Sequence, residues 1–208
     1  MLFVLSGSLY WQIDNPLQLP VHVLALPVDH QVPLVGALIV PYLLFYPYLI
    51  VTILYTAWLA PRVFQILMWA GILAFNFANI LYLLYPTAVF RSAVLSEQTL
   101  WAPLINWMHT LFPPGNAFPS EHTMGACLLG ATWVLIRNRW TPWALLLSGA
   151  IVAATLGLHQ HFVLDLLSGA TISLLCFLAA AGAVAFVRLQ PMQVSFAQQE
   201  QETVILLS

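Results

Sequence analysis

The chain has 208 residues, of which 62% are hydrophobic and 6% are charged, with a formal net charge of −2. Soluble domains carry roughly 25% charged residues, so this chain lacks the polar surface that water requires and must be solvated largely by lipid. The small net charge gives no reason to expect a nucleic-acid partner. The composition therefore predicts an all-α protein, a polytopic bundle of about five transmembrane helices with additional interfacial helices.

The N-terminal residues 1–32 are apolar but interrupted. Met1–Tyr10 is too short to span a bilayer, and no Lys or Arg precedes it, so a secretory signal peptide is not expected. Three prolines break any continuous helix in the rest of the segment. We therefore expect residues 1–32 to lie on the membrane as an interfacial segment. The prolines are Pro16, Pro20 and Pro27.

Five apolar segments then follow as candidate spans, although the fourth is short for the ~20 residues that a transmembrane helix needs. Between the second and third, residues 100–112 are typical of an amphipathic interfacial helix. The Gln-rich residues 189–208 are expected to be a mostly unordered cytoplasmic tail. The transmembrane domain is thus predicted over residues 33–188. Its expected spans are residues 32–58, 63–84, 120–136, 142–158 and 161–187.

The basic residues predict the orientation of these spans. The chain has no Lys, and four of its five Arg lie in three loops that alternation places on one side of the bilayer. The positive-inside rule makes that side cytoplasmic. The polar motifs and Arg91 then lie on the extracytoplasmic side of a cell membrane or endomembrane. The four cytoplasmic residues are Arg62, Arg137, Arg139 and Arg188.

His161 and Asp165 open the last span. Their i, i+4 spacing places both on one face of a helix. A carboxylate that accepts from one imidazole nitrogen fixes the tautomer and leaves the other nitrogen as a nucleophile or base. An Asp in an apolar span is costly and is therefore a functional candidate. The alternative is an ion pair at a helix end in contact with water.

A second polar motif begins the third span. Ser120 follows Pro119 and precedes an apolar run, which is typical of a helix N-cap. The N–H groups of such a first turn form an anion site, and His122 is placed to protonate a leaving oxygen. Arg91 is the fixed cation on this side, and its planar guanidinium suits phosphate. The alternatives are a structural cap, an interfacial His and a lipid-headgroup contact.

Taken together, the motifs 119–122 and His161-x-x-x-Asp165 resemble the type 2 phosphatidic acid phosphatase superfamily. The Pro-Ser-Gly-His element of that family is matched except that Glu121 replaces Gly. In its Ser-Arg-x5-His-x3-Asp element the His and Asp match, whereas Ala154 and Thr155 stand at the Ser-Arg positions. Of its Lys-x6-Arg-Pro element, only the Arg has a counterpart here, Arg91.

One branch of the superfamily has similar departures. The Tyr-Pro-Thr sequence at residues 85–87, and the absence of an Arg before His161, are similar to the inositol phosphorylceramide synthase-like members. The resemblance covers roughly residues 29–188. It is specific for the superfamily and does not select a substrate.

The resemblance implies an integral membrane phosphatase or phosphotransferase that acts on a lipid phosphate or phospho-headgroup and needs no cofactor or metal. Its expected partners are that lipid and the surrounding membrane lipids. His161 would attack phosphorus and form a phosphohistidine, Asp165 would orient its ring, and His122 would protonate the leaving alcohol. The phosphoryl group would be held by Arg91 and Ser120, with His159 as the candidate for the donor that the missing Arg supplies elsewhere.

Two other classes of protein remain open from the residues alone. A metal-binding membrane protein would use a His-x-His pair with a carboxylate, a ligand set that suits zinc or copper. A non-catalytic carrier or scaffold would use the same residues only for packing. The metal-binding candidates are His122, His159, His161 and Asp165.

Overall fold

The computed structural model describes residues 20–91, 100–112 and 114–206, with side chains described as far as Val187. These residues contain two 3-10 turns and six α-helices and no strand, which confirms the predicted all-α class. The 3-10 turns are η1 (Asp29–Gln31) and η2 (Gly36–Leu38). The helices are α2 (Ile39–Leu59), α3 (Pro61–Leu84), α4 (Ala102–Leu111), α5 (Glu121–Ile136), α6 (Thr141–Gly157) and α7 (Val163–Leu206).

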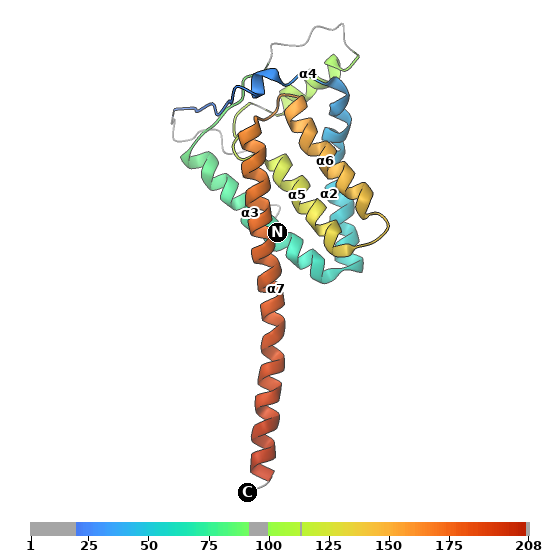
Figure 1. Ribbon diagram of the computed structural model, residues 1–208, viewed down its shortest axis with the longest axis vertical. Helices are drawn as coiled ribbons and strands as arrows, with labels where there is room; N and C mark the ends of the chain where they lie inside the picture. The colour runs from blue at the N-terminus through green and yellow to red at the C-terminus, as the bar shows by residue number, and fades with distance from the viewer. Residues whose placement is uncertain (1–19, 92–99, 113, 207–208) are drawn as a thin grey trace.

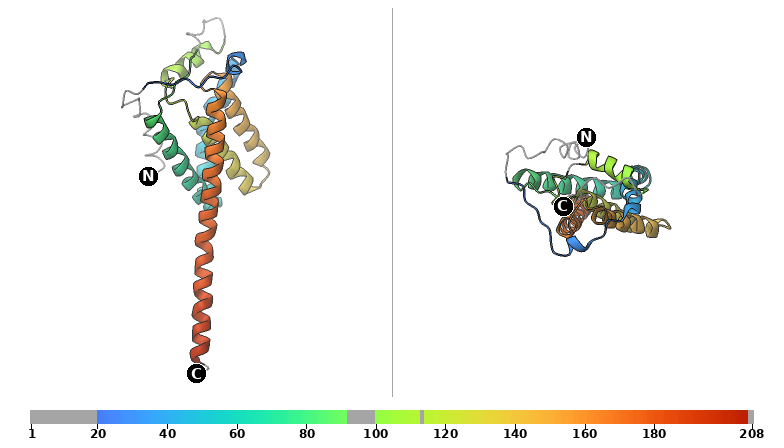
Figure 2. Two further views of the ribbon diagram at one scale, coloured as in Figure 1. Left: turned by 60° about the vertical axis from the view of Figure 1, so that its left-hand side comes forward. Right: turned by 90° about the horizontal axis from the view of Figure 1, so that it is seen from above.

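Five helices form a bundle, and the sixth covers one of its ends. α5 packs against α3, α6 and α7, and α2 packs against α3 and α6. α4 and η1 lie at one end of this bundle, where α7 begins, and the second half of α7 extends alone beyond the other end (Figures 1 and 2). The end that carries α4 and η1 is called the α4 end below.

Three helices are long and apolar enough to cross a membrane: Gly36–Leu59, Pro61–Leu84 and Val163–Val187. α6 is a shorter apolar helix of 17 residues, and α5 has 16 residues. Many large apolar side chains on the outer faces of the long helices are exposed, as lipid contact requires; Leu54, for example, is 63% exposed. The bundle is therefore that of a membrane protein.

Two predicted boundaries differ from the structure. The first span was expected from residue 32, but its helix begins only at residue 36, because Val32 precedes Pro33 and is held extended at ψ 118°. The tail was expected to be mostly unordered, but α7 continues through it to Leu206. The tail is rich in Gln, Glu and Leu, which are good helix formers, and extending an existing helix needs no new nucleus.

The N-terminal segment crosses the α4 end of the bundle. The prediction for its first 19 residues lies outside the described part of the chain. Beyond them, His22 pairs with Thr87 in a parallel bridge, and its ring stacks on Tyr85 with the centroids 4.2 Å apart. These contacts join the N-terminal segment to the connection after α3, and η1 follows it over the start of α7 (Figure 1).

α4 confirms the helix that the sequence predicts over residues 100–112, whose interfacial position stays a prediction, and a small apolar core fixes it. That core lies between α4, α2 and the end of α6, apart from the main core of the bundle. Because α4 is anchored in this way, Phe112, the C-cap residue that follows the helix, is held beside the first turn of α5. The small core consists of Ile39, Tyr42, Ile105, Met108, Phe112, Ala154 and Leu158.

The opposite end of the bundle carries the basic loops. The turns between α2 and α3 and between α5 and α6 both lie there (Figure 1), and they contain Arg62, Arg137 and Arg139. Trp140 and Trp143 are exposed at the same end, and the Arg139 guanidinium lies 5.2 Å from the Trp140 ring centroid. Exposed Trp beside Arg is typical of the level where a membrane meets water. The structure thus confirms that these Arg lie opposite the α4 end.

Candidate active site

The first turn of α5 is tied to the first turn of α7. The Ser120 hydroxyl accepts from the Thr123 N–H at 3.3 Å, which confirms Ser120 as the N-cap of α5. The Ser120 N–H in turn donates to the Asp165 carbonyl oxygen at 3.0 Å. Both polar motifs, which lie forty residues apart in sequence, therefore meet through a backbone hydrogen bond at the α4 end.

This contact depends on Gly169. A Cβ at this position would lie 2.8 Å from the Ser120 carbonyl oxygen, closer than real Cβ contacts come. The neighbouring atom belongs to the backbone, so it cannot turn aside as a flexible side chain would. Gly169 thus permits the close approach of α7 to the N-terminus of α5.

Two carboxylates cap the N-terminus of α7. Asp165 accepts from the Phe162 N–H at 2.8 Å, and Asp29 accepts from the Val163 N–H at 2.8 Å. Carboxylates at this position satisfy free N–H groups and oppose the positive end of the helix dipole. Asp29 was not predicted as a site residue. The sequence did contain a signal for Asp29, however. A carboxylate in a largely apolar segment is costly unless it has a hydrogen-bond partner, so Asp29 was a candidate for a structural or functional contact.

His161 precedes α7 rather than lying on it. The helix begins at Val163, so the predicted helical i, i+4 face does not exist, yet the His161 Nδ1 still lies 3.6 Å from an Asp165 carboxylate oxygen. The nearer partner of Nδ1 is the Ala117 carbonyl oxygen at 2.9 Å. A carbonyl only accepts, so Nδ1 carries the proton and a neutral ring presents the lone pair on Nε2.

The Ala117 carbonyl is itself held by the connection after α3. The Thr87 carbonyl accepts from the Ala117 N–H at 3.4 Å, and the Thr87 hydroxyl accepts from the Phe118 N–H at 2.8 Å. The Tyr82 hydroxyl donates to the Pro119 carbonyl oxygen at 2.5 Å. Both side chains are buried. They fix the loop that orients His161, and sequence reasoning did not identify either of them as a site residue.

His122 lies in the first turn of α5 within a group of aromatic rings. Its ring stacks on Tyr42 with the centroids 4.5 Å apart and lies 4.9 Å from the Phe45 centroid. Tyr46 and Phe112 present their rings almost perpendicular to it. Within the described residues its Nε2 is buried without a hydrogen-bond partner.

The two candidate catalytic imidazoles lie at the same end of the bundle. His122 is in the first turn of α5 and His161 directly precedes α7, and the hydrogen bond from the Ser120 N–H to the Asp165 carbonyl joins these two helix starts. Glu121, between Ser120 and His122, has one buried carboxylate oxygen with no hydrogen-bond partner in the described part of the chain.

Arg91 lies at the same end and joins α4 to the turn between α6 and α7. One guanidinium nitrogen donates to the Phe112 carbonyl oxygen, and another donates to the Gln160 side-chain oxygen at 2.7 Å. Gln160 is 3% exposed, and the sequence analysis did not single it out. The predicted role of His159, as a phosphate donor in place of the missing Arg, is a separate one and is not tested by this contact.

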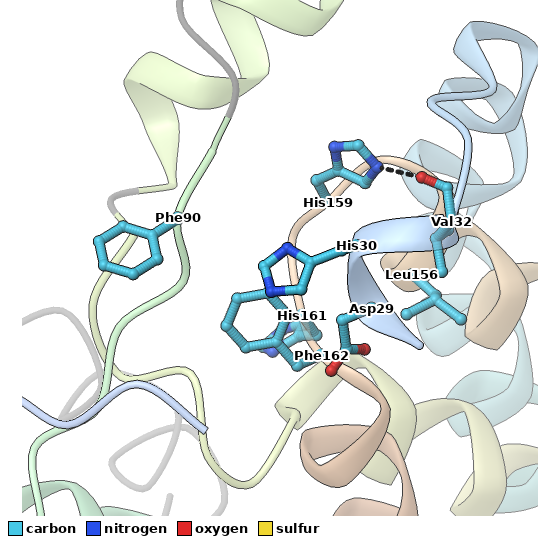
Figure 3. Close-up of a pocket in the computed structure, with 8 residues that line it drawn as sticks. All are labelled: Asp29, His30, Val32, Phe90, Leu156, His159, His161 and Phe162. Carbon is cyan, nitrogen blue, oxygen red and sulfur yellow. Dashed lines mark hydrogen bonds between the residues drawn. The ribbon is translucent and has the colours of Figure 1, made fainter. Parts of the chain in front are cut away.

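His159 turns toward the N-terminal segment. Its backbone has φ 53°, in the left-handed region, and its Nε2 lies 3.0 Å from the Val32 carbonyl oxygen (Figure 3). His109 of α4 lies nearby. Burial lowers the pKa of His109, the positive charge of Arg91 lowers it further, and a hydrogen bond to the backbone of Leu158 opposes both effects.

A pocket opens beside His161 between the N-terminal segment, the end of the connection after α3 and the turn that precedes α7 (Figure 3). Three of its lining side chains are His. Neither His122 nor Arg91 lines it, so the pocket adjoins the candidate site on the side of His161. It is lined by Asp29, His30, Val32, Phe90, Leu156, His159, His161 and Phe162.

The described residues do not favour the metal-binding alternative. Among them, no group of three or more His, Cys, Asp or Glu side chains is arranged to hold a metal ion. The four residues proposed as ligands, His122, His159, His161 and Asp165, are all described and do not form such a group.

Comparison with known proteins supplies the family. No curated protein and no solved structure gives a significant match to the chain. A family model described as the PAP2 superfamily, the type 2 phosphatidic acid phosphatases, matches residues 11–179. That match spans most of the chain and includes both polar motifs and the pocket. The chain therefore belongs to the PAP2 superfamily, whose members are phosphatases or phosphotransferases.

Proposed function

We propose that this protein transfers the phosphoryl group of a membrane lipid phosphate through a phosphohistidine on His161. The observation that carries the proposal is the hydrogen bond from His161 Nδ1 to the Ala117 carbonyl, which leaves the Nε2 lone pair for attack. Family membership supports an enzyme of the phosphatase or phosphotransferase kind. The lipid substrate is supported by a site at one end of a bundle of apolar helices.

The first step forms a bond between His161 Nε2 and phosphorus and breaks the bond from phosphorus to the lipid oxygen. His122 gives the proton that the leaving alcohol takes up. In the second step a hydroxyl or water attacks phosphorus, the N–P bond breaks, and the proton of the attacking group returns to His122. The unpartnered Nε2 of His122 supports this role, because no other described group competes for it.

The phosphoryl oxygens are proposed to lie at the first turn of α5, with Ser120 and Arg91. Backbone N–H groups at a helix N-terminus favour an anion, and a guanidinium can donate several hydrogen bonds at once. The Asp165 carboxylate lies 3.6 Å from His161 Nδ1 and is proposed to orient the ring and to stabilise the positive charge of the phosphorylated imidazole. His159 is not favoured as an additional phosphate ligand, because its Nε2 is directed to the Val32 carbonyl oxygen.

The proposal includes the position of the protein in the membrane. The α4 end is proposed to face the extracytoplasmic side, because the opposite end carries Arg62, Arg137 and Arg139. Residues 33–188 then form the catalytic transmembrane domain, preceded by the N-terminal segment and followed by a cytoplasmic tail. The finer assignment to the inositol phosphorylceramide synthase-like branch stays a prediction that rests on the motif at residues 85–87.

The test is to trap the covalent intermediate. Purified protein in vesicles that contain phosphatidic acid labelled with 32P in the phosphate should acquire label that survives alkali and is lost in acid, as a phosphohistidine does. His161→Asn should abolish the label and lower phosphate release by at least a thousandfold. His22→Asn is the matched control, since the His22 ring only stacks on Tyr85. Label that persists in His161→Asn would exclude this nucleophile.

A further inference from the structure

The pocket beside His161 has a chemical character of its own. None of its eight lining residues is Arg or Lys, and its fixed charge is the carboxylate of Asp29. Arg91 does not line it and is hydrogen-bonded to Phe112 and Gln160. A phosphate would therefore meet a negative charge and no fixed positive charge here, so the pocket is not suited to the phosphoryl group itself.

The hydrogen bonds of two of the three pocket imidazoles, those of His159 and His161, show which ligand atoms these rings can bind. His159 Nε2 faces the Val32 carbonyl and so carries the ring proton, which leaves Nδ1 as an acceptor in the neutral ring. His161 donates from Nδ1 to Ala117, which leaves Nε2 as an acceptor. In Figure 3 the second nitrogen of the His159 ring lies on the side away from Val32. Because both free ring nitrogens are hydrogen-bond acceptors, a ligand of this pocket must carry hydrogen-bond donors such as hydroxyl groups.

The carboxylate of Asp29 adds to this acceptor character. Its two oxygens accept from the N–H groups of Val163 and Leu26, at 2.8 and 2.6 Å. The side chain is 8% exposed and is therefore fixed in place. A carboxylate oxygen has more than one lone pair, so Asp29 can accept a further hydrogen bond from a ligand.

The remaining walls are apolar and aromatic. Phe90 and Phe162 both line the pocket beside His161 (Figure 3). Phe90 is 74% exposed, so its ring is free to pack against a ligand that enters. Such a pocket suits a compact ligand with C–H faces and several hydroxyl groups. The C–H faces can pack on the aromatic rings, and the hydroxyl groups can donate to the acceptors.

We propose that this pocket binds a small polyol that accepts the phosphoryl group from His161. The inference rests on the proposed phosphohistidine chemistry and names the acceptor for its second step. One hydroxyl of the polyol reaches out of the pocket to the phosphoryl group on His161. Its oxygen bonds to phosphorus as the N–P bond breaks, and its proton passes to His122, which lies outside the pocket. The other hydroxyls donate to His159 Nδ1 and to Asp29. Water takes the same place when the pocket is empty of polyol.

The test compares two acceptors in one reaction. Vesicles that contain phosphatidic acid are supplied with equal molar concentrations of glycerol and ethanol, and glycerol phosphate, ethyl phosphate and free phosphate are measured. Only glycerol can use the pocket acceptors while it reacts. We expect at least tenfold more glycerol phosphate than ethyl phosphate. This ratio does not depend on the total rate, so it reports on acceptor recognition alone.

Two variants test whether the pocket is responsible for the preference for glycerol over ethanol. His30→Ala removes an exposed ring from its rim, and His159→Asn removes the imidazole while keeping a residue that tolerates a positive φ. Each should reduce the ratio of glycerol phosphate to ethyl phosphate by at least threefold. His22→Ala, a His outside the pocket, should keep the ratio of the unmodified protein.

The outcomes separate the two proposals. If phosphate is released but glycerol has no advantage over ethanol, or if its advantage survives in both variants, the polyol site is wrong and the phosphohistidine mechanism stands. If neither phosphate release nor transfer occurs, and His161 is never labelled with any lipid phosphate tested, the proposed function itself fails.

Discussion

Thr87 determines how the ring of His161 is presented. Its hydroxyl and carbonyl hold the backbone at residues 117 and 118, and the Ala117 carbonyl then receives the Nδ1 proton. Thr87 itself does not need to touch the substrate in this arrangement. We propose that Thr87 acts through the Ala117 carbonyl oxygen, which faces His161 Nδ1, and is therefore a positioning residue and not a catalytic one.

Replacement of Thr87 by Val tests this role. The change keeps the branched shape but leaves the part-buried Phe118 N–H without its acceptor, which costs about 1–3 kcal/mol. We expect kcat for lipid phosphate to fall about tenfold, the effect of about 1.4 kcal/mol on the barrier, with KM almost unchanged.

Thr171→Val is the matched control for this prediction. The Thr171 hydroxyl is exposed and bonds only to the Leu167 carbonyl of its own helix. Thr171→Val should keep the kcat of the unmodified protein. If Thr87→Val raises KM and leaves kcat intact, Thr87 contributes to binding or stability and does not orient His161.

At the scale of helices, the site depends on the distance between α5 and α7. Ser120 donates its N–H across this contact, and Gly169 leaves room for it. Gly169→Ala forces a Cβ toward a backbone oxygen that cannot move alone, so α7 must shift away from α5. We expect turnover to fall at least a hundredfold, because His161 moves with α7 while His122 stays on α5.

The same helix provides a control for Gly169→Ala. Gly182 has no atom within 4 Å of the position that a Cβ would take. Gly182→Ala should therefore retain activity and should raise thermal stability slightly, because Ala favours the helix by up to about 1 kcal/mol. Equal activity in the two variants would show that the close approach at Gly169 is not needed for catalysis.

Much of this arrangement could be predicted from sequence, because apolar length and capping residues are local signals. The six helices, the N-cap at Ser120 and the grouping of the Arg loops at one end all follow from such signals. The start of α7 was not predicted to the residue, since one of its two capping carboxylates, Asp29, lies more than a hundred residues before Val163. Because the helix begins at Val163, the helical face expected for His161 and Asp165 does not form.

The candidate site residues also fall into two groups, those with a local sequence signal and those whose contacts come from distant parts of the chain. His122, His161 and Asp165 were predicted because their motifs place chemical groups at the starts of apolar segments, and their catalytic roles stay predictions. Thr87 and Gln160 were missed, since a buried Thr or Gln has no distinctive local pattern. Their importance comes from partners that only the folded chain supplies, such as the Arg91 guanidinium beside Gln160.

For the whole molecule, the proposed orientation follows from the positions of the basic loops and the candidate active site at opposite ends of the bundle. The candidate active site occupies the α4 end, and the loops with Arg62, Arg137 and Arg139 occupy the other. A reversed protein would place three Arg on the extracytoplasmic side, against the positive-inside rule. It would also present the site to cytoplasmic lipid phosphates, so the orientation decides which leaflet supplies the substrate.

Single-cysteine labelling in intact cells tests the orientation. The background variant carries Cys127→Ala and Cys176→Ala, because these two are the native cysteines. Arg139→Cys then reports on the Arg end and Val21→Cys on the α4 end, since both side chains are exposed. A membrane-impermeant maleimide should label position 21 in intact cells and position 139 only after permeabilisation. The reverse pattern would place the site in the cytoplasm and overturn the proposed extracytoplasmic substrate.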